Sequence, residues 1–367
     1  MKFRELFAKV CLSASLLPAL ALPSQVHAAV TTSAAKAFFR GNNMAGTVLL
    51  VQNGAVKTVN YGYAWFGRRV SNGAANVTYP AASLQKVITG AMIVQIMNEK
   101  KHTKQAFSQY TKVSRWYPKL KNAQKVTLGE LLTQTSGYLA RGSEDSRGWV
   151  QSENSAINWV VNKINTTKQA KRGQFYYSNA NYILLVGIIR KLTGHSYSYN
   201  FNKRIVKRLG LKQTYIREQV PKKTMQAVSY AYLWKRKYQQ PVSFTKTVAS
   251  QLPGAANMCT TPLEYYKIML GLQNGEVLSQ ADFNYLTHLK SRKTTYSGGM
   301  YMKKGGKVKV AFGSIAGEHY GSYVQLSADN RNGIIMFVNE RSQTEPQIKS
   351  LAYTLLDQIQ PQTFTIS

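Results

Sequence analysis

Apolar and β-branched residues concentrate near both ends of the chain, in short runs that predict strands. Residues 46–52 and 55–59 flank Asn53-Gly54, and two such runs about an Asn-Gly pair are typical of a β-hairpin. The carboxyl-terminal part contains three further β-rich runs, at 308–312, 323–326 and 333–338, with a turn at 329–332. A helix at 351–359 is expected to close the chain.

Between these strands the spacing of apolar residues becomes that of helices. Residues 83–97 carry apolar side chains every three or four positions, at Val87, Ile88, Met92, Ile93 and Ile96. Residues 127–272 look mainly helical, broken by Gly, Pro and Asn. The pattern predicts an α+β fold: one antiparallel sheet built from the N- and C-terminal segments, with flanking helices and an inserted, mainly helical lobe at roughly 100–250. The natural place for a site is the cleft between the two lobes.

The amino-terminal residues have the pattern of a secretory signal peptide. Three basic residues among the first nine precede a short apolar stretch, and Val26-His27-Ala28 then offers a small-residue cleavage site. The apolar stretch is too short to cross a bilayer. We therefore expect residues 1–28 to be removed on export, leaving 29–367 as a catalytic domain.

Charge and cysteine content agree with an exported protein. Removing the leader deletes Cys11 and leaves Cys259 as the single cysteine, so no internal disulfide can form. The chain carries 48 Lys and Arg against 15 Asp and Glu, a net charge of +33. These cations are spread along the sequence and form no arginine-rich arm, so nucleic acid is not the expected partner. Outside a cell the available polyanion is the envelope, which predicts retention at the wall of a Gram-positive-type cell.

Ser83-Leu84-Gln85-Lys86 is the first candidate for chemistry. In a helix, residues i and i+3 share a face, so the lysine amine can reach the serine hydroxyl. A serine needs such a base because its hydroxyl is a weak nucleophile at neutral pH. Two other Ser-x-x-Lys tetrads occur, at Ser33/Lys36 and Ser243/Lys246, but they lack the strand-to-helix setting of the first.

Four segments in order resemble the family of class C β-lactamases, D,D-carboxypeptidases and related esterases. The resemblance covers roughly residues 35 to 358, and Gln134 stands where that family usually has histidine. The similar segments are Tyr79-Pro-Ala-Ala-Ser-Leu-Gln-Lys, Val126-Thr-Leu-Gly-Glu-Leu-Leu-Thr-Gln-Thr-Ser-Gly-Tyr, Phe175-Tyr-Tyr-Ser-Asn-Ala-Asn and Pro253-Gly-Ala-Ala-Asn. The third contains the Tyr-x-Asn motif of the family, as Tyr177 and Asn179.

The resemblance implies a β-lactamase/transpeptidase-like fold and a catalytic role for each motif residue. Ser83 would form the acyl-enzyme, and Lys86 and Tyr177 would handle its proton. The Lys86 ammonium is expected to favour the Tyr177 anion, which could then accept the serine proton and later activate water. Asn179 would orient Lys86 and bind the substrate amide. An oxyanion hole would form from the backbone N–H groups of Ser83 and of a residue on the edge strand.

The family's third motif, a basic residue followed by a small residue and Gly, admits two placements here. Counting back from the last strand favours Ile315-Ala316-Gly317, with Glu318 as the backbone oxyanion donor and His319 at the cleft edge. The alternative is His319-Tyr320-Gly321, four residues later. In the first placement isoleucine replaces the cation that helps hold a free substrate carboxylate.

These features together predict a serine hydrolase that acts on D-alanyl groups of the cell envelope. Peptidoglycan D,D-carboxypeptidase and teichoic acid D-alanyl esterase are its two versions, and a wall-binding homologue with weak or lost catalysis is the alternative. His102, His195 and His288 lack the spacing of metal ligands, and no phosphate-binding loop occurs, so no cofactor is expected. The expected partner is a wall polymer, peptidoglycan or teichoic acid, and no protein partner is predicted.

Overall fold

The computed structural model describes residues 24–145, 147–289, 294–315, 317–342 and 345–359. Most of the expected leader therefore lies outside the described residues, and the cleavage site after Ala28 falls within the first helix and stays a prediction. Among the residues described, no helix has both the length and the apolarity to cross a bilayer.

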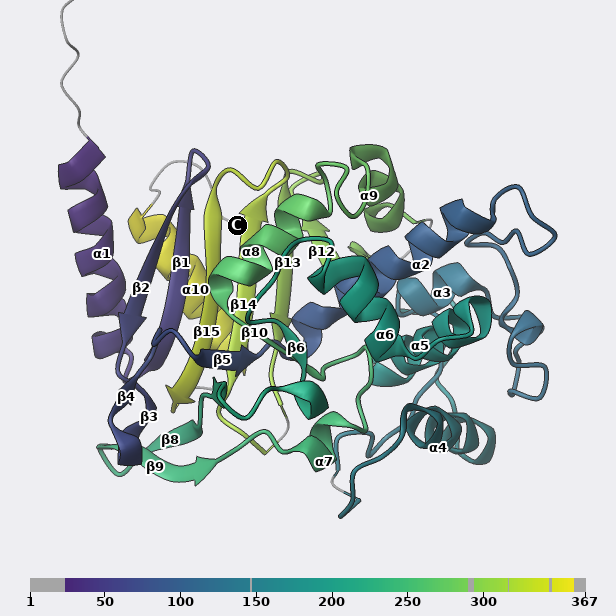
Figure 1. The fold of residues 1–367 in the computed structure, drawn as a ribbon, viewed down its shortest axis with the longest axis horizontal. Coiled ribbons are helices and arrows are strands. Elements are labelled where there is room, and N and C mark those ends of the chain that lie inside the picture. The colour runs from purple at the N-terminus through teal and green to yellow at the C-terminus, as the bar shows by residue number, and fades with distance from the viewer. Residues whose placement is uncertain (1–23, 146, 290–293, 316, 343–344, 360–367) are drawn as a thin grey trace, which may run out of the picture.

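The largest sheet joins strands from both ends of the chain (Figure 1). Its main path runs β11-β12-β13-β14-β15-β1-β2 and is antiparallel throughout, with β1 pairing with β15. The strands are β1 (Ala45–Gln52), β2 (Ala55–Tyr61), β11 (Tyr296–Ser297), β12 (Met300–Lys303), β13 (Val308–Gly313), β14 (Gly321–Ser327) and β15 (Gly333–Arg341). The predicted α+β class and the two-ended sheet are confirmed.

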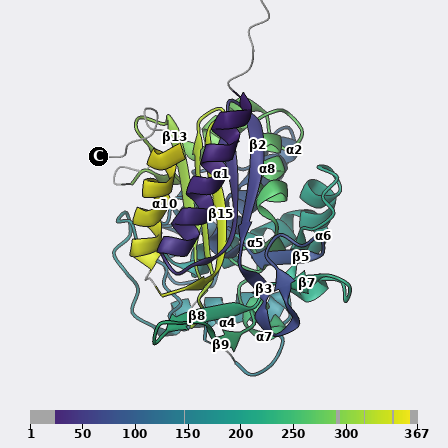
Figure 2. The same cartoon turned by 90° about the vertical axis from the view of Figure 1, so that its left-hand side faces the viewer.

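The terminal helices cover one face of this sheet. Figure 2 shows α1 (Ser24–Gly41) and α10 (Glu345–Ile359) lying side by side across the strands. Phe39 and Leu355 from these helices share a buried cluster with Tyr323 of β14. The opposite face packs into a larger core with the helical lobe, so both faces of the sheet are buried.

The inserted lobe consists of helices around one buried central helix, α5, whose residues 179–189 are all buried. The helices between β5 and β11 are α2 (Lys86–Lys100), α3 (Leu128–Leu132), α4 (Glu153–Thr166), α5 (Asn179–Thr193), α6 (Tyr197–Phe201), α7 (Lys246–Ala249), α8 (Pro262–Gly271), which packs against β1 and β15 of the large sheet, and α9 (Gln280–Thr287). Short turns of other helix types are η1 (Phe66–Arg68), η2 (Ala82–Gln85), η3 (Val113–Arg115), η4 (Asn202–Val206) and η5 (Arg217–Gln219).

The segment 215–242 departs from the expectation of a mainly helical insert, because it contains strands. β8 (Ser229–Leu233) and β9 (Arg236–Val242) form a hairpin, and β8 pairs in parallel with β15. Smaller sheets contain β3 (Tyr63–Trp65) with β4 (Val70–Ser71), and β6 (Tyr215–Ile216), β10 (Met258–Thr260), β5 (Val77–Pro80) and β7 (Met225–Gln226). The hairpin turns through Trp234 and Lys235, whose φ angles of 49° and 61° are usually signalled by Asn or Gly.

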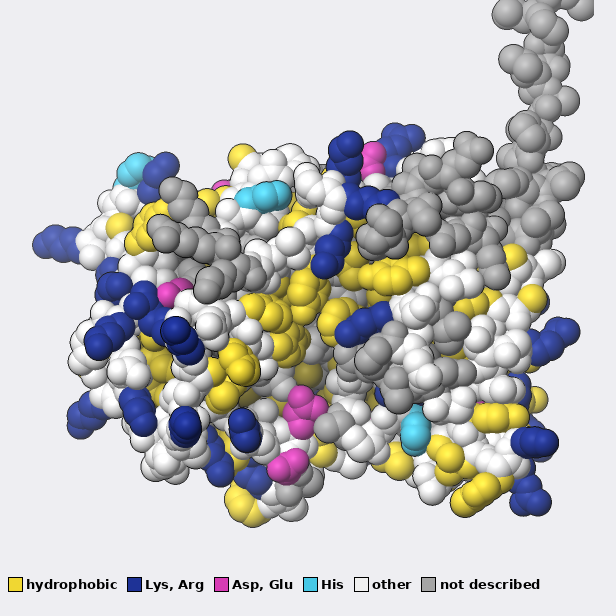
Figure 3. All heavy atoms as spheres, turned by 180° about the vertical axis from the view of Figure 1, so that it is seen from behind, with side chains coloured by type: hydrophobic (Ala, Val, Ile, Leu, Met, Phe, Trp, Pro, Cys, Tyr) yellow, Lys and Arg dark blue, Asp and Glu magenta, His cyan; other side chains and the backbone are white. Residues whose placement is uncertain are grey.

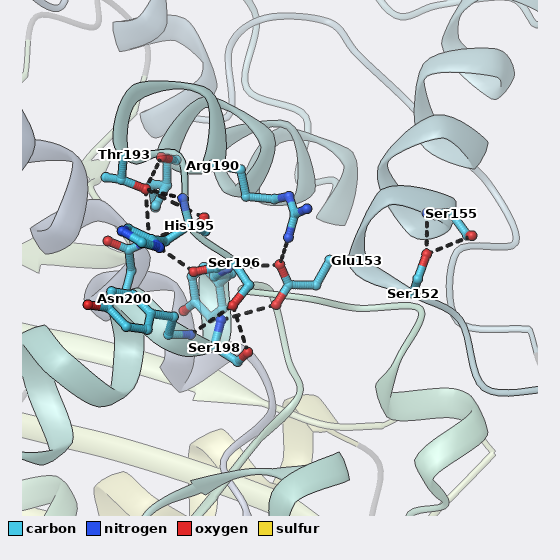
Figure 4. Close-up of polar contacts among 12 residues, drawn as sticks. Ser152, Glu153, Ser155, Arg190, Thr193, His195, Ser196, Ser198 and Asn200 are labelled. Atoms are coloured by element: carbon cyan, nitrogen blue, oxygen red, sulfur yellow. Dashed lines mark hydrogen bonds and ion pairs between the residues drawn. The ribbon is translucent and has the colours of Figure 1, made fainter.

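A carboxylate joins three helices of the lobe (Figure 4). Glu153, at the start of α4, accepts hydrogen bonds from the backbone N–H groups of Tyr197 (2.8 Å) and Ser198 (3.0 Å) at the start of α6. It also forms an ion pair with Arg190 of α5. An anion at a helix N-terminus is favourable, and here it also fixes α5 relative to its neighbours. Since α5 begins two residues after Tyr177, this cluster supports the site without belonging to it.

Candidate active site

The nucleophile candidate lies at a sharp strand-to-helix turn. β5 ends at Pro80, η2 carries Ser83, and α2 begins at Lys86. Ala82 has a φ of 46°, a left-handed conformation that costs of order 1 kcal/mol for a residue with a Cβ atom. A backbone hydrogen bond ties the turn to β10, because the Ala81 N–H donates to the Met258 carbonyl (2.8 Å). Ser83 itself is half-buried, so part of its surface remains accessible to solvent.

Lys86 is completely buried and points at the serine. Its Nζ lies 2.9 Å from Ser83 Oγ and 2.9 Å from the carbonyl oxygen of Ala255. Burial lowers the pKa of Lys86 to about 7, although the carboxylate of Glu144 opposes the shift. Near neutral pH a large fraction of Lys86 is therefore the free amine, which can accept the serine proton.

A buried amide network fixes the Ala255 carbonyl in place. Gln85 donates to Asn257 Oδ1 (2.9 Å) and accepts from the Met258 N–H (3.0 Å), so residues 253–258 are bound to the start of α2. Thr89 donates to the Gly254 carbonyl (2.6 Å) one turn further along the helix. The Pro253-Gly-Ala-Ala-Asn segment thus supplies a backbone hydrogen-bond acceptor to Lys86, a role that the sequence analysis did not assign.

Tyr177 comes from a different part of the chain and lies beside the same two residues. Lys86 Nζ is 5.0 Å from the centre of its ring, and the Ser83 side chain is near enough to its hydroxyl to influence the pKa of the phenol. The residue is 39% exposed, but the hydroxyl end is enclosed by protein. Burial raises the pKa of Tyr177 well above its usual value of 10, neighbouring Tyr296 adds to the rise, and the Ser83 side chain opposes it.

The expected tyrosinate is therefore not the form that the site favours. Burial disfavours the charged form of both Lys86 and Tyr177, so near neutral pH Tyr177 is a phenol and Lys86 is divided between amine and ammonium. The prediction that a Lys86 ammonium promotes the Tyr177 anion is wrong in this structure, since the same desolvation acts on the lysine. The amine is then the stronger available base, and the phenol can relay a proton.

Gln134, which replaces the usual histidine, holds the backbone on both sides of Tyr177. The Tyr176 N–H donates to the Gln134 carbonyl (2.9 Å), and the Ser178 N–H donates to Gln134 Oε1 (3.0 Å). The same Oε1 accepts from Asn181 of α5 (2.5 Å). This glutamine is a positioning residue, because it fixes the tyrosine without touching Ser83.

Asn179 lies at the site but does not contact Lys86 in the described structure. Its Nδ2 donates to Glu144 Oε1 (2.7 Å), and its Oδ1 is buried without a hydrogen-bond partner among the described residues. Tyr177, Asn179 and Glu144 line one pocket of about 330 Å³ together with residues 139–143. A larger open pocket of about 690 Å³, bordered by Glu99 and Arg204, includes none of these residues.

The strand that lies against the nucleophile is β13, and the contact is made by Gly313. A Cβ atom on Gly313 would come within 2.5 Å of the Ser83 amide nitrogen and 2.8 Å of Ala82 Cβ. Ser322, opposite Gly313 on β14, donates to the Ala81 carbonyl (2.8 Å). The end of β13 is therefore packed on the backbone of the serine turn.

A family model described as Beta-lactamase matches residues 33–357. The chain belongs to the beta-lactamase family. Curated relatives include a teichoic acid D-alanine hydrolase of Staphylococcus aureus, 26% identical over 322 residues that make up 86% of this chain and 75% of that protein.

Solved structures share the fold. FmtA from Staphylococcus aureus superposes with a TM-score of 0.71 at 23% identity, over 90% of each chain. A D-amino acid amidase from Ochrobactrum anthropi SV3 superposes with a TM-score of 0.75 at 17% identity, over 92% of this chain and 99% of the amidase. The chain is accordingly a serine hydrolase of the beta-lactamase family.

The strand end that lies against Ser83 comes just before the predicted third motif. It is the end of β13 at Gly313, two residues before Ile315, which is buried in the core, and Ala316 lies outside the described residues. β13 ends at Gly313 and β14 begins at Gly321, so the connection is longer than a short hairpin turn, and the placement of the motif at Ile315-Ala316-Gly317 stays a prediction. Neither placement supplies a Lys or Arg at this position.

The backbone N–H groups of Glu318 and His319 are both already hydrogen-bonded. The Glu318 N–H donates to the Ile315 carbonyl (3.2 Å), so the predicted oxyanion donor is already engaged in a turn. The His319 N–H donates to Ser229 Oγ (2.7 Å) on β8, and burial together with Arg341 lowers the pKa of its ring. Gly317, in a left-handed conformation (φ 74°), belongs to the same turn.

The two other Ser-x-x-Lys tetrads are surface features. Ser33 and Lys36 are exposed on α1, and Ser243 and Lys246 are exposed at the start of α7. A buried amine is what distinguishes Lys86 from these lysines, and it is also the condition that lowers a lysine pKa. Cys259 is buried and free, and the described residues contain no cluster of three or more His, Cys, Asp or Glu that could hold a metal.

Replacing Gly313 with Ala should reduce activity sharply while leaving the chain folded. The added methyl group must displace β13 from the Ser83 amide, and a misplacement of about 1 Å costs about 10²-fold in rate. The measurement is kcat/KM for a small aryl ester, with circular dichroism to verify the fold. Gly67→Ala is the matched control, because its nearest neighbour lies 3.5 Å away. Activity within threefold of wild type for Gly313→Ala would show that β13 does not shape the site.

Proposed function

We propose that this protein is an exported esterase that removes D-alanyl groups from teichoic acid through an acyl-enzyme on Ser83. One observation carries the proposal: a buried lysine amine lies 2.9 Å from the serine hydroxyl in a chain that is 26% identical to a teichoic acid D-alanine hydrolase. The geometry supports acyl transfer through Ser83, and the similarity to the teichoic acid D-alanine hydrolase supports D-alanine as the acyl group.

Acylation begins with Ser83 Oγ attacking the D-alanyl carbonyl carbon as Lys86 Nζ accepts its proton. The oxygen of the carbonyl becomes negative and is stabilised by backbone N–H groups, of which the Ser83 amide at the β13 contact is the first candidate. When the tetrahedral intermediate collapses, the polyol oxygen leaves and takes the proton back from Lys86. The neutral Tyr177 hydroxyl, which lies beside Ser83, can relay that proton.

Deacylation repeats the sequence with water in place of the polyol. Lys86 is again a free amine after giving up its proton, and it accepts a proton as the water oxygen attacks the Ser83 ester. D-alanine leaves, and the serine hydroxyl is restored. A lysine whose pKa is about 7 can both accept and return a proton, because neither of its protonation states is strongly preferred at neutral pH.

The strand end beside Ser83 supports an ester substrate over a peptide terminus. Residues 311–314 read Ala-Phe-Gly-Ser and carry no cation, whereas a substrate with a free carboxylate needs one for binding. The ester of a polyol has no carboxylate at that place. The proposal is therefore supported by the absence of a cation at residues 311–314 as well as by the Lys86 amine at the start of α2.

The surface charge supports a polyanionic substrate. Figure 3 shows Lys and Arg spread over one face of the molecule, densely on its helical side, around a hollow with hydrophobic side chains and a few acidic ones at its border. With a net charge of +33, attraction to a phosphate-rich polymer raises the encounter rate at low ionic strength. The attraction should weaken as salt is added.

The test is D-alanine release from purified cell walls, with and without prior removal of teichoic acid. We expect the mature protein to release D-alanine from intact walls and little from stripped walls, with Ser83→Ala as the inactive reference. Release should fall as salt rises from 50 to about 300 mM, because the polymer contact is screened.

Each alternative has its own outcome. Equal release from stripped walls would establish a peptidoglycan carboxypeptidase in place of the esterase. Wall binding without release, from a folded protein that forms no adduct on Ser83 with an aryl ester, would favour the wall-binding homologue. Either result contradicts the proposed function.

A further inference from the structure

Two hairpins meet at one corner of the molecule and hold a stack of aromatic rings (Figure 1, lower left). One is β3–β4 with the turn η1, and the other is β8–β9. The Tyr63 N–H donates to the Tyr238 hydroxyl (3.1 Å), and the Phe66 N–H donates to that of Tyr230 (3.0 Å). The rings of Phe66 and Tyr238 stack with their centres 4.4 Å apart. The hydrogen bonds and the stacking together fix the two hairpins relative to each other.

Positively charged side chains lie over the rings of this corner. The cations, with their distances to the ring centres, are Arg68 over Trp65 (4.1 Å), Arg69 over Phe66 (4.4 Å) and Lys237 over Tyr61 (5.0 Å). Arg68 and Arg69 are exposed, and Lys237 is half-buried. A guanidinium that stacks on a ring keeps its N–H donors in its own plane, where an anion can reach them. Because stacking already orders the side chain, less entropy is lost when a ligand binds.

These cations have no acidic neighbour on the surface. Residues 61–71 and 229–243 contain no Asp or Glu, and none of the ion pairs found among the described residues includes the three cations. Glu340 accepts a hydrogen bond from the Tyr238 N–H, but it is completely buried. Burial raises the pKa of Glu340 to about 7, although Lys237 opposes the rise. The solvent-facing charge of the corner is therefore positive.

The backbone is strained at the residues that build the stack. Arg69 and Tyr238 have φ angles of 54° and 59°, a left-handed conformation that is unfavourable for residues with a Cβ atom. Both side chains contact the ring of Phe66 as a result of this local geometry. Such strain concentrates in segments that bind ligands, where the surrounding structure holds it in place.

Phosphodiesters are the anions that this corner fits, because the planar N–H fork of arginine matches phosphate oxygens. The rings are covered by cations or by one another, which leaves few faces on which nucleic-acid bases could stack. We propose that Arg68, Arg69 and Lys237 form a phosphate surface, which holds a polyol-phosphate polymer while its D-alanyl esters are hydrolysed. The identity of the polymer rests on the proposed function.

The phosphate surface is separate from the catalytic pocket, and one polymer chain can reach both. That pocket is lined by residues 139–145 and 177–179, none of which belongs to the hairpins. β4 ends at Ser71, and Ser83 is 12 residues further along, a stretch that spans at most about 40 Å. Figure 3 shows hydrophobic side chains beside Lys and Arg at the lower right, the corner of the hairpins, on the face that carries the hollow. An anchored polymer would have a raised effective concentration at Ser83.

The first arm of the test compares a polymer with a small ester. Arg68→Gln/Arg69→Gln/Lys237→Gln should lower kcat/KM for D-alanine release from soluble teichoic acid by about 10- to 100-fold at about 50 mM salt. For an aryl ester, which is too small to reach the corner, kcat/KM should stay within about twofold of wild type and thereby report a correct fold.

A matched control removes the same charge from exposed lysines of the helical lobe, as Lys101→Gln/Lys104→Gln/Lys125→Gln. It should keep the polymer kcat/KM within about threefold of wild type, because contacts at the corner remain. An equal loss in this control would overturn the phosphate surface, since net charge alone would then explain the effect.

The second arm measures binding without hydrolysis. Calorimetry of Ser83→Ala with teichoic acid freed of D-alanine should show affinity that falls with salt, and adding the three Gln substitutions should reduce the log–log slope by about 2. Arg68→Lys/Arg69→Lys, which keeps the charge, should preserve the slope but weaken binding several-fold, since an ammonium lacks the planar fork. Equal slopes with and without the three cations, or tighter binding of single-stranded DNA than of teichoic acid, overturns the inference. If wall hydrolysis fails while this binding persists, the proposed function is wrong and the phosphate surface stands.

Discussion

Ser83→Ala should lower kcat/KM for an aryl ester by about 10⁴- to 10⁶-fold and abolish the covalent acyl-enzyme. The reason is that no other hydroxyl occupies its place: Ser83 Oγ is the atom 2.9 Å from the buried amine, at the start of a helix and against the β13 backbone. Intact-protein mass spectrometry after reaction with a slowly hydrolysed ester measures the adduct, and peptide mapping locates it.

The matched control for this experiment is Ser243→Ala, which removes the serine of an exposed Ser-x-x-Lys tetrad. It should keep full activity and full labelling on Ser83. A wild-type adduct on any other residue, or residual labelling of folded Ser83→Ala at the wild-type rate, would falsify the assignment of the nucleophile.

The residues that lie close in sequence were predictable. Ser83 and Lys86 are three apart on one helical turn, and Tyr177 and Asn179 belong to one short motif, so local pattern sufficed to find them. The strands at 308–312, 323–326 and 333–338 were also predicted, because each is a continuous β-rich run between turn signals. The structure brings the helix, the motif and this sheet together.

The residues that act through long-range packing were not predictable. Ala255 contributes a backbone carbonyl, and Gly313 contributes the absence of a side chain, so neither has a chemical signature in the sequence. Glu144 lies in an irregular loop, with no periodicity to place it. One signal was available: Gln134, noted as a departure from the family, is the residue that holds both sides of Tyr177.

The ionisation states also required the structure. A sequence shows that a lysine and a tyrosine are neighbours, but it does not show how completely each is removed from water. Burial of Lys86 lowers the pKa of its amine, and burial of the Tyr177 hydroxyl raises the pKa of that phenol, so the expected ammonium and tyrosinate are both disfavoured. The proton acceptor consequently moves from the phenol to the amine.

This reversal gives the second large effect: Lys86→Met should reduce kcat/KM by about 10³-fold without unfolding the protein. Methionine has a similar length and no charge, and replacing a buried ionisable group with an apolar one of similar volume is often neutral or stabilising. Thermal unfolding should therefore occur at or above the wild-type temperature while ester hydrolysis is nearly lost. Lys246→Met, at an exposed lysine of another tetrad, is the control and should behave as wild type.

The pH profile of the wild-type enzyme then identifies the base. Because only the free amine accepts a proton, kcat/KM should rise tenfold per pH unit below the Lys86 pKa of about 7 and level off above it. Glu144 stabilises the charged lysine, so Glu144→Gln should move the midpoint to lower pH. If a tyrosinate were the base, the rise would instead continue above pH 10, since burial raises the pKa of Tyr177 beyond that value. A midpoint near 7 that disappears in Lys86→Met therefore assigns the proton transfer to the buried amine.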